Sequence, residues 1–214
     1  RVAASRAAVY GADGRGWITL LLLTASGVVA VLSGLGSDLQ PISSLFLTPH
    51  PPAAGLPELR AGQLWRPFTP IVIHFGVAHL LFNGLNWWTW AGAIEVRKGA
   101  GLFGALVLSA ALVTNLSEHL WGVLFAAHRL RLVGGLSGVL YAVFGYAWAK
   151  GRLDPADGIG VSPSTVQWML AWLLLCLTGL MGPIANVAHF SGLLWGLLFA
   201  RLDIAWFQWR KHHP

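Results

Sequence analysis

Six apolar stretches, separated by polar or glycine- and proline-rich segments, run through the 214 residues of the chain. They lie at 17–35, 76–96, 99–117, 135–149, 165–182 and 185–202. Several approach the roughly 17–25 residues that an α-helix needs to cross a bilayer. Unpaired strand edges are not tolerated in hydrocarbon, so the pattern predicts an all-α polytopic membrane protein with six transmembrane helices.

A long connection separates the first two predicted helices and is rich in proline and glycine. It also carries apolar pieces, such as residues 45–47 and the pair Leu64-Trp65. This mixture predicts a first loop that is partly embedded in the membrane and is not a solvated linker.

Three regions follow from this pattern: an N-terminal segment (1–16), a six-span domain (17–203) and an interfacial tail (204–214). The chain begins at Arg1 and not at a methionine, so we expect a further N-terminal segment or domain to precede it.

Composition supports a membrane protein and argues against a soluble one. Hydrophobic residues make up 56% of the chain and charged residues only 10%, whereas a soluble domain carries about 25% charged residues to cover its surface. A net charge of +6 could indicate nucleic acid, but the basic residues lie at segment ends and form no single face, so no nucleic-acid partner is expected. The single cysteine, Cys176, excludes an intramolecular disulfide and a cysteine-rich metal site.

The basic residues predict the orientation of the six helices. Ten Lys or Arg residues fall on the side that holds both termini, and four fall on the other side. Loops with the excess of Lys and Arg usually remain in the cytoplasm, so both termini are predicted to be cytoplasmic. Trp206 and Trp209, beside Arg210 and Lys211, look like an interfacial anchor after the last helix.

Polar residues are costly inside a membrane and mark candidate functional positions. His79 and Asn83 are four residues apart and share one face of the second helix. Ser137 opens the fourth segment, with Tyr141 one turn later, and His189 lies about one turn into the sixth. The fourth segment is short, about 21 Å at 1.5 Å per residue, so it begins below the outer surface and brings these residues to one depth.

These residue types suit nucleophilic catalysis. A serine hydroxyl needs a base to take its proton, and histidine is the usual base near neutral pH. Ser137 lies in the first turn of its helix, where free backbone N–H groups suit an oxyanion, and His79 and Asn83 could add side-chain donors. No carboxylate is close to His189 in sequence, so we expect a Ser–His dyad, with the imidazole oriented by other means such as stacking on Tyr141.

Four alternatives remain open. Glycines and Ser137 can serve helix packing, as we expect for Gly192 and Gly196. A membrane-helix binding protein without activity is disfavoured by the presence of both Ser137 and His189. A transporter would need more polar residues in the cytoplasmic half, and a zinc site from His74, His79 and His189 lacks suitable spacing and a carboxylate. We therefore expect no metal and no cofactor.

The motifs themselves resemble those of the rhomboid family, in its bacterial six-span form, from about Trp65 to Asp203. Three motifs match the catalytic motifs of the family in order and spacing: His79-x-x-x-Asn83, Gly135-Leu-Ser137-Gly138-x-x-Tyr141 and Ala188-His189-x-x-Gly192. Glu95-x-x-x-Gly99 resembles its structural motif at the inner end of the second helix, and the pair Trp65-Arg66 resembles its first-loop signature.

The resemblance implies an intramembrane serine endopeptidase of a bacterial inner membrane, with its active site open to the periplasmic side. It makes Ser137 the nucleophile, His189 the general base, and His79, Asn83 and the Ser137 N–H the oxyanion hole, with an outward-open cavity expected above Ser137. Tyr141, Gly135 and Gly192 would support this site. It further implies a lateral gate at the fifth helix and its following loop, where Phe82 and Trp172 face each other. The partners would be membrane lipids and single-span membrane proteins, cut near the outer end of a helix after a small residue.

Overall fold

The computed structural model describes residues 16–49, 55–125, 132–180, 182 and 184–213. These residues are helical, with no strand among them, as the apolar pattern predicts. The long helices of the described part are α2 (Trp17–Leu32), α4 (Val77–Lys98), α5 (Ala100–Phe125), α6 (Ser137–Leu153), α7 (Pro163–Leu177) and α8 (Asn186–His212). They coincide with the six predicted segments, although α5 and α8 continue well beyond the predicted ends at 117 and 202.

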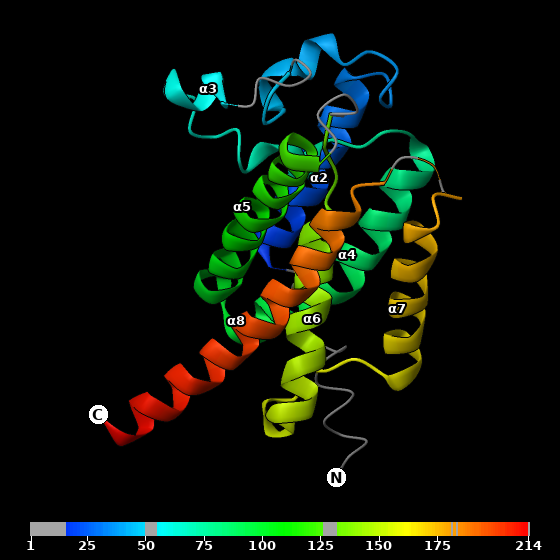
Figure 1. Cartoon of the computed structure of the whole chain (residues 1–214). Helices are drawn as coiled ribbons and strands as arrows, with labels where there is room; N and C mark the ends of the chain where they lie inside the picture. The colour runs from blue at the N-terminus through cyan, green and yellow to red at the C-terminus, as the bar shows by residue number, and fades with distance from the viewer. Residues whose placement is uncertain (1–15, 50–54, 126–131, 181, 183, 214) are drawn as a thin grey trace.

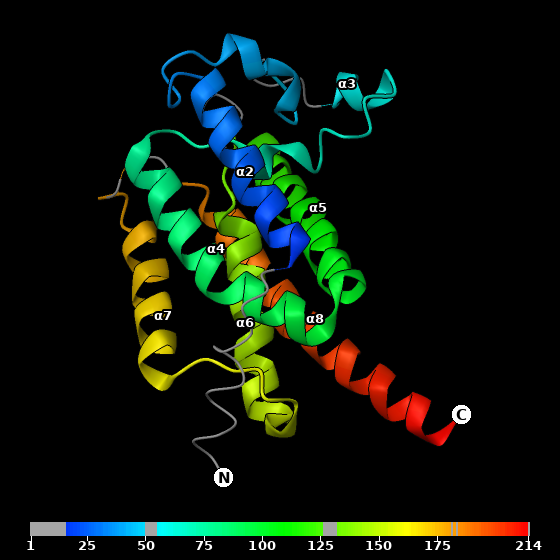
Figure 2. The ribbon, with the colours of Figure 1, turned by 180° about the vertical axis from the view of Figure 1, so that it is seen from behind.

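Helix α6 forms the centre of the bundle (Figure 1). Nearly all of its residues from Gly138 to Lys150 are buried, because other helices surround it on every side. Helices α5 and α8 pack against one face of α6, and α2 and α4 cover the opposite face (Figure 2). Helix α7 lies at the edge of the bundle, and the C-terminal part of α8 projects away from it.

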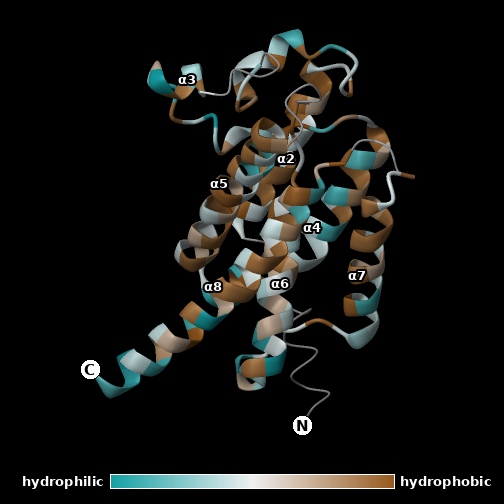
Figure 3. Ribbon diagram, viewed as in Figure 1, coloured by the Kyte–Doolittle hydropathy of each residue, from teal (hydrophilic) through white to brown (hydrophobic). Residues whose placement is uncertain are grey.

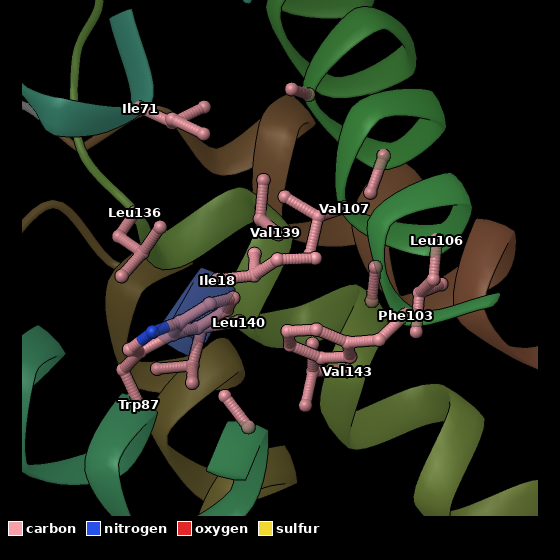
Figure 4. Close-up of a cluster of buried hydrophobic side chains, with 14 of the residues drawn as sticks. Ile18, Ile71, Trp87, Phe103, Leu106, Val107, Leu136, Val139, Leu140 and Val143 are labelled. Atoms are coloured by element: carbon pink, nitrogen blue, oxygen red, sulfur yellow. The ribbon is translucent and has the colours of Figure 1, made fainter. Parts of the chain in front are cut away.

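The main apolar core lies where α2, α4, α5 and α6 meet (Figure 4). Trp87 and Phe103 are fully buried, with ring centroids 5.7 Å apart. Trp87 also donates its indole N–H to the Thr19 carbonyl of α2 at 3.2 Å, so the large ring is buried without an unpaired donor. This packing fixes α4, which carries His79 and Asn83, against the central helix.

The connection between α2 and α4 folds over one end of the bundle, and its described residues form three short helices: η1 (Gln40–Leu45), α3 (Pro57–Arg60) and η2 (Thr69–Val72). Arg66 holds it together, because its buried guanidinium donates to the carbonyl oxygens of Phe46 at 2.6 Å and Ser43 at 3.3 Å. The Trp65 indole N–H donates to the Ser44 carbonyl at 3.1 Å. The pair predicted as a first-loop signature therefore folds the loop onto itself through backbone carbonyls.

Glu95, in the last turn of α4, is bonded to the first turn of α2. Its carboxylate accepts the backbone N–H groups of Ile18 and Thr19 at 2.9 and 2.8 Å, and the Thr19 hydroxyl at 2.7 Å. Because the preceding Gly16 has no side chain, Glu95 supplies the N-terminal cap that α2 lacks. Gly99, with φ of 81°, ends α4 in a conformation that other residues rarely adopt and lets α5 begin at the next residue.

Five charged residues, Lys98, Lys150, Asp154, Asp157 and Asp203, form a lysine–aspartate cluster near the far ends of α4 and α6. Lys150, 2% exposed, places its Nζ 2.7 Å from Asp154 and 2.6 Å from Asp157, and Lys98 Nζ lies 2.9 Å from Asp203. Burial alone would raise the pKa of Asp157, but hydrogen bonds and charge from both lysines outweigh it and hold that pKa below its ordinary value. The cluster thereby ties α4, α6, α8 and the loop after α6 together.

Apolar side chains also cover the outside of the bundle, and most hydrophilic residues lie near helix ends or in loops (Figure 3). Val31 and Trp168, for example, are each 77% exposed. Contact between water and so large an apolar surface is unfavourable, which indicates that lipid covers it. By length and composition, two helices of the described part, α5 and α8, could each cross a membrane, and α2 and α7 are apolar but shorter.

Candidate active site

Ser137 and His189 are separated by 52 positions in the sequence and meet between α6 and α8. The His189 Nε2 atom lies 2.7 Å from the Ser137 Oγ atom, within hydrogen-bond distance. His189 is buried, whereas Ser137 is partly exposed. The pair is therefore enclosed on the histidine side, and Ser137 is its less buried member.

The chain reaches Ser137 through a sharp entry into α6. Ser137 is the first residue of the helix, so its backbone N–H is one of the four that lack an intrahelical partner. Gly135, two residues earlier, has φ of 126°, and its N–H donates to the Pro70 carbonyl at 2.9 Å. This bond ties the start of α6 to the end of the loop before α4.

Close contact between α6 and α8 sets the distance between the two residues. A Cβ at Gly192 would overlap the Gly138 carbonyl oxygen, and one at Gly196 would overlap the Ala142 carbonyl oxygen. The backbones can approach this closely only because neither position carries a side chain. Gly192 lies one turn after His189, so this contact is made at the level of the Ser137–His189 pair.

His79 of α4 borders the same region, and Asn83 lies one helical turn further along α4. A Cβ at Gly135 would lie 2.8 Å from His79 Nε2 and 3.7 Å from Ser137 Oγ, so both atoms border the space beside Gly135. His79 Nδ1 accepts the Phe75 N–H at 3.2 Å, which leaves its Nε2 as the N–H donor of a neutral ring. Asn83 is buried, and its Nδ2 donates one hydrogen to the His79 carbonyl at 2.9 Å, which leaves a second amide hydrogen.

The His189 ring is held by an aromatic neighbour. Its centroid lies 4.9 Å from that of Tyr141, with 32° between the two planes. The Tyr141 hydroxyl donates to the Met169 carbonyl of α7 at 3.0 Å, which fixes the aromatic ring. His189 Nδ1 is buried and has no hydrogen-bond partner within the described residues, so no carboxylate from this part of the chain orients the imidazole.

Phe82 and Trp172 stack between α4 and α7, with ring centroids 5.0 Å apart and 25° between their planes. Phe82 is 37% exposed, so the pair lies at the surface of the bundle. Of the loop after α7, which was predicted to belong to the same feature, residues 181 and 183 lie outside the described part.

A carboxylate that the sequence pattern does not reveal lies beside the His189 segment. Glu118 of α5 accepts the backbone N–H of Ala188 at 2.8 Å. The two residues are 70 positions apart, and Glu118 belongs to none of the motifs, so no spacing rule could pair them. Among the described residues, no group of three or more His, Cys, Asp or Glu side chains is arranged to hold a metal ion.

Comparison with known proteins gives the family. The model of the rhomboid domain matches residues 61–206. The rhomboid protease GlpG of Enterobacter sp. is 37% identical over 190 residues, which cover 88% of this chain and 63% of that protein. The proteins of the same name from Klebsiella pneumoniae and Salmonella paratyphi A are each 35% identical. The matched residues cover 87% of this chain and 62% of the Klebsiella protein, and 88% of this chain and 63% of the Salmonella protein. The chain thus spans less than two thirds of the length of these relatives. Because the family model covers more than half of it, including Ser137 and His189, the chain is an integral membrane protein of the rhomboid family.

Proposed function

We propose that this protein is an intramembrane serine endopeptidase in which Ser137 is the nucleophile and His189 the general base. The observation that carries the proposal is the 2.7 Å contact between Ser137 Oγ and His189 Nε2 across α6 and α8. A serine hydroxyl attacks a carbonyl only when a positioned base removes its proton, and this contact supplies that base. The relatives, which are called rhomboid proteases, support the same reaction class.

Acylation begins when His189 Nε2 takes the Ser137 proton as Oγ attacks the carbonyl carbon of the scissile peptide. The negative charge moves to the carbonyl oxygen, which accepts hydrogen bonds from His79 Nε2–H, an Asn83 amide hydrogen and the Ser137 N–H. Collapse of the tetrahedral intermediate breaks the C–N bond, and His189 gives its proton to the leaving amine. Water, deprotonated by His189, then hydrolyses the Ser137 ester.

The geometry around His189 favours a dyad over a triad. In the base form Nε2 is unprotonated and the hydrogen resides on Nδ1, which has no described acceptor. The Tyr141 ring, 4.9 Å away, takes over the orienting role and offers its π face to the imidazolium that forms.

The proposal includes six membrane crossings, one for each long helix, with both termini in the cytoplasm and the site opening to the outer side. The excess of Lys and Arg on the side that holds both termini supports this orientation. Helix α6 has 17 residues, about 25 Å at 1.5 Å per residue, so it is shorter than the hydrocarbon, which is roughly 30 Å thick. Ser137, at the first residue of this helix, then lies below the membrane surface and needs water from an outward-open cavity.

Substrates are single-span membrane proteins that enter laterally from lipid. The stacked Phe82 and Trp172 join α4 to α7, the helix at the edge of the bundle, and their separation opens a path toward Ser137. An extended segment is needed at Ser137, so substrate helices that unwind readily near their outer end are preferred.

Labelling with a fluorophosphonate tests the proposed chemistry directly, because the reagent reacts only with an activated serine. The wild type should be labelled at Ser137, whereas Ser137→Ala and His189→Ala should not be labelled. Ser109→Ala removes a serine of α5 whose hydroxyl bonds to the Trp195 indole and not to a histidine, and serves as the matched control. Labelling of Ser137→Ala equal to the wild type would contradict the assignment of the nucleophile. Absence of labelling in a folded wild type would favour a binding protein without protease activity.

A further inference from the structure

Helix α8, which carries His189, begins without a cap of its own. Its N-cap residue is Ala185, and no side chain of α8 accepts the free N–H groups of the first turn. An N-cap Ser, Thr, Asp or Asn would normally accept the N–H of the second or third helical residue. In α8 these residues are Val187 and Ala188, and Ala188 is only 5% exposed, so water is a poor substitute.

Glu118 of α5 occupies the place of the missing cap. Its Oε2 accepts the Ala188 N–H at 2.8 Å, from the third residue of α8. A neighbouring helix therefore satisfies a donor that Ala185 cannot. The positive end of the α8 dipole also favours a carboxylate at this position.

The capped turn leads directly into His189. The His189 N–H donates to the Ala185 carbonyl at 3.2 Å, which is the first helical bond of α8, and its ring reaches Ser137 at 2.7 Å. Fraying of this turn would move the His189 backbone and lengthen the contact with Ser137. We propose that Glu118 is a positioning residue that holds His189 in reach of Ser137 by capping α8 from α5. This inference rests on the proposed function of the pair.

A second hydrogen bond joins α5 to α8 and provides a control. Its removal tests whether any lost contact between these helices lowers activity, or only the loss of the cap that positions His189. Trp195, further along α8, donates its indole N–H to the Ser109 hydroxyl at 2.9 Å. Ser109→Ala removes this bond between the same two helices and leaves the first turn of α8 intact. It is the matched control for Glu118→Ala.

The experiment measures kcat and KM for cleavage of a single-span reporter in one detergent, together with the thermal unfolding midpoint. Ser137→Ala must first be inactive while the wild type cleaves, which establishes the proposed function. Glu118→Ala should then lose about 10- to 100-fold in kcat with KM within about twofold. Glu118→Gln keeps an acceptor oxygen and should retain most of the wild-type kcat, and Ser109→Ala should retain it fully.

A rescue variant keeps the test decisive if Glu118→Ala folds poorly. Ala185→Asp in the Glu118→Ala background places a carboxylate at the N-cap of α8 itself and should restore most of the lost kcat. A wild-type kcat in Glu118→Ala, or a loss in Glu118→Gln as large as in Glu118→Ala, would overturn the positioning role while the dyad stands. Failure of Ala185→Asp to restore kcat would also count against it.

Discussion

The contact between α6 and α8 at Gly192 makes a quantitative prediction about catalysis. In Gly192→Ala the added methyl carbon would lie 3.1 Å from the Gly138 carbonyl carbon and 3.2 Å from Thr114 Cγ2, and closer still to the Gly138 carbonyl oxygen. Backbone atoms cannot rotate away as a flexible side chain can, so the helices must separate. Gly192 is one turn from His189, so the separation acts directly on the Ser137–His189 distance.

The size of the effect follows from that distance. Relief of the overlap requires a shift of about 1 Å, which would lengthen the Ser137 Oγ to His189 Nε2 contact from 2.7 Å to roughly 3.7 Å, beyond hydrogen-bond range. A displacement of about 1 Å in a catalytic constellation can cost about 100-fold in rate. We therefore expect Gly192→Ala to lower kcat by about two orders of magnitude.

Two variants separate this effect from general destabilisation. Gly27→Ala lies inside α2, where an added Cβ meets nothing within 4 Å, and should leave kcat unchanged. Gly196→Ala also overlaps α6, at Ala142, but one turn further from His189, so it should lower the unfolding midpoint more than it lowers kcat. Reporter cleavage and thermal unfolding in detergent measure both quantities. A Gly192→Ala variant with wild-type kcat would refute the argument that close backbone contact sets the catalytic distance.

Three further predictions concern stability and access. Glu95→Ala should lower the free energy of unfolding by about 3 kcal/mol or more, because the carboxylate accepts two backbone N–H groups and the Thr19 hydroxyl. Equilibrium unfolding in detergent measures this loss, and a loss below about 1 kcal/mol would contradict the capping role. The pKa of Asp157 is lowered in the folded protein, so its stabilising effect is fully present above its ordinary pKa of 3.8 and is lost as the pH falls toward the folded value. The stability difference between wild type and Asp157→Asn should thus shrink below pH 3.8, and a difference that grows on acidification would contradict the sign. Trp172→Ala removes the stacking on Phe82 and should raise kcat/KM for cleavage of a membrane reporter by about 2- to 10-fold. The rate at which a fluorophosphonate labels Ser137 should not change, and a decrease in kcat/KM would argue against a gate.

Hydropathy was sufficient to predict the helices but not their ends. The predicted sixth segment stops at 202, where Asp203 and later polar residues begin, yet α8 continues to His212. Backbone hydrogen bonds do not depend on hydropathy, so a helix persists where its side chains become polar. Helix α5 likewise passes through the polar residues Glu118 and His119 without a break, and it continues to Phe125 because apolar residues resume at Leu120.

The proximity of residues that belong to the motifs could be predicted from the sequence, whereas contacts made by residues outside the motifs could not. The arrangement of Ser137, His189 and Tyr141 follows from motif order and a common depth, and the structure brings these three residues together. The cap that Glu118 gives to α8 could not be predicted, since it depends on how α5 and α8 pack and not on sequence spacing. The bond from Asn83 to the His79 carbonyl was likewise hidden, because a polar side chain in a helix can turn back to its own backbone.

Cleavage of a single-span membrane reporter by the purified wild type and by Ser137→Ala, in the same detergent, tests the central claim most directly. The proposed mechanism predicts that the wild type cuts the reporter and that Ser137→Ala, which keeps the fold but lacks the nucleophilic oxygen, does not. Equal cleavage by the two proteins would contradict the assignment of Ser137 as the nucleophile.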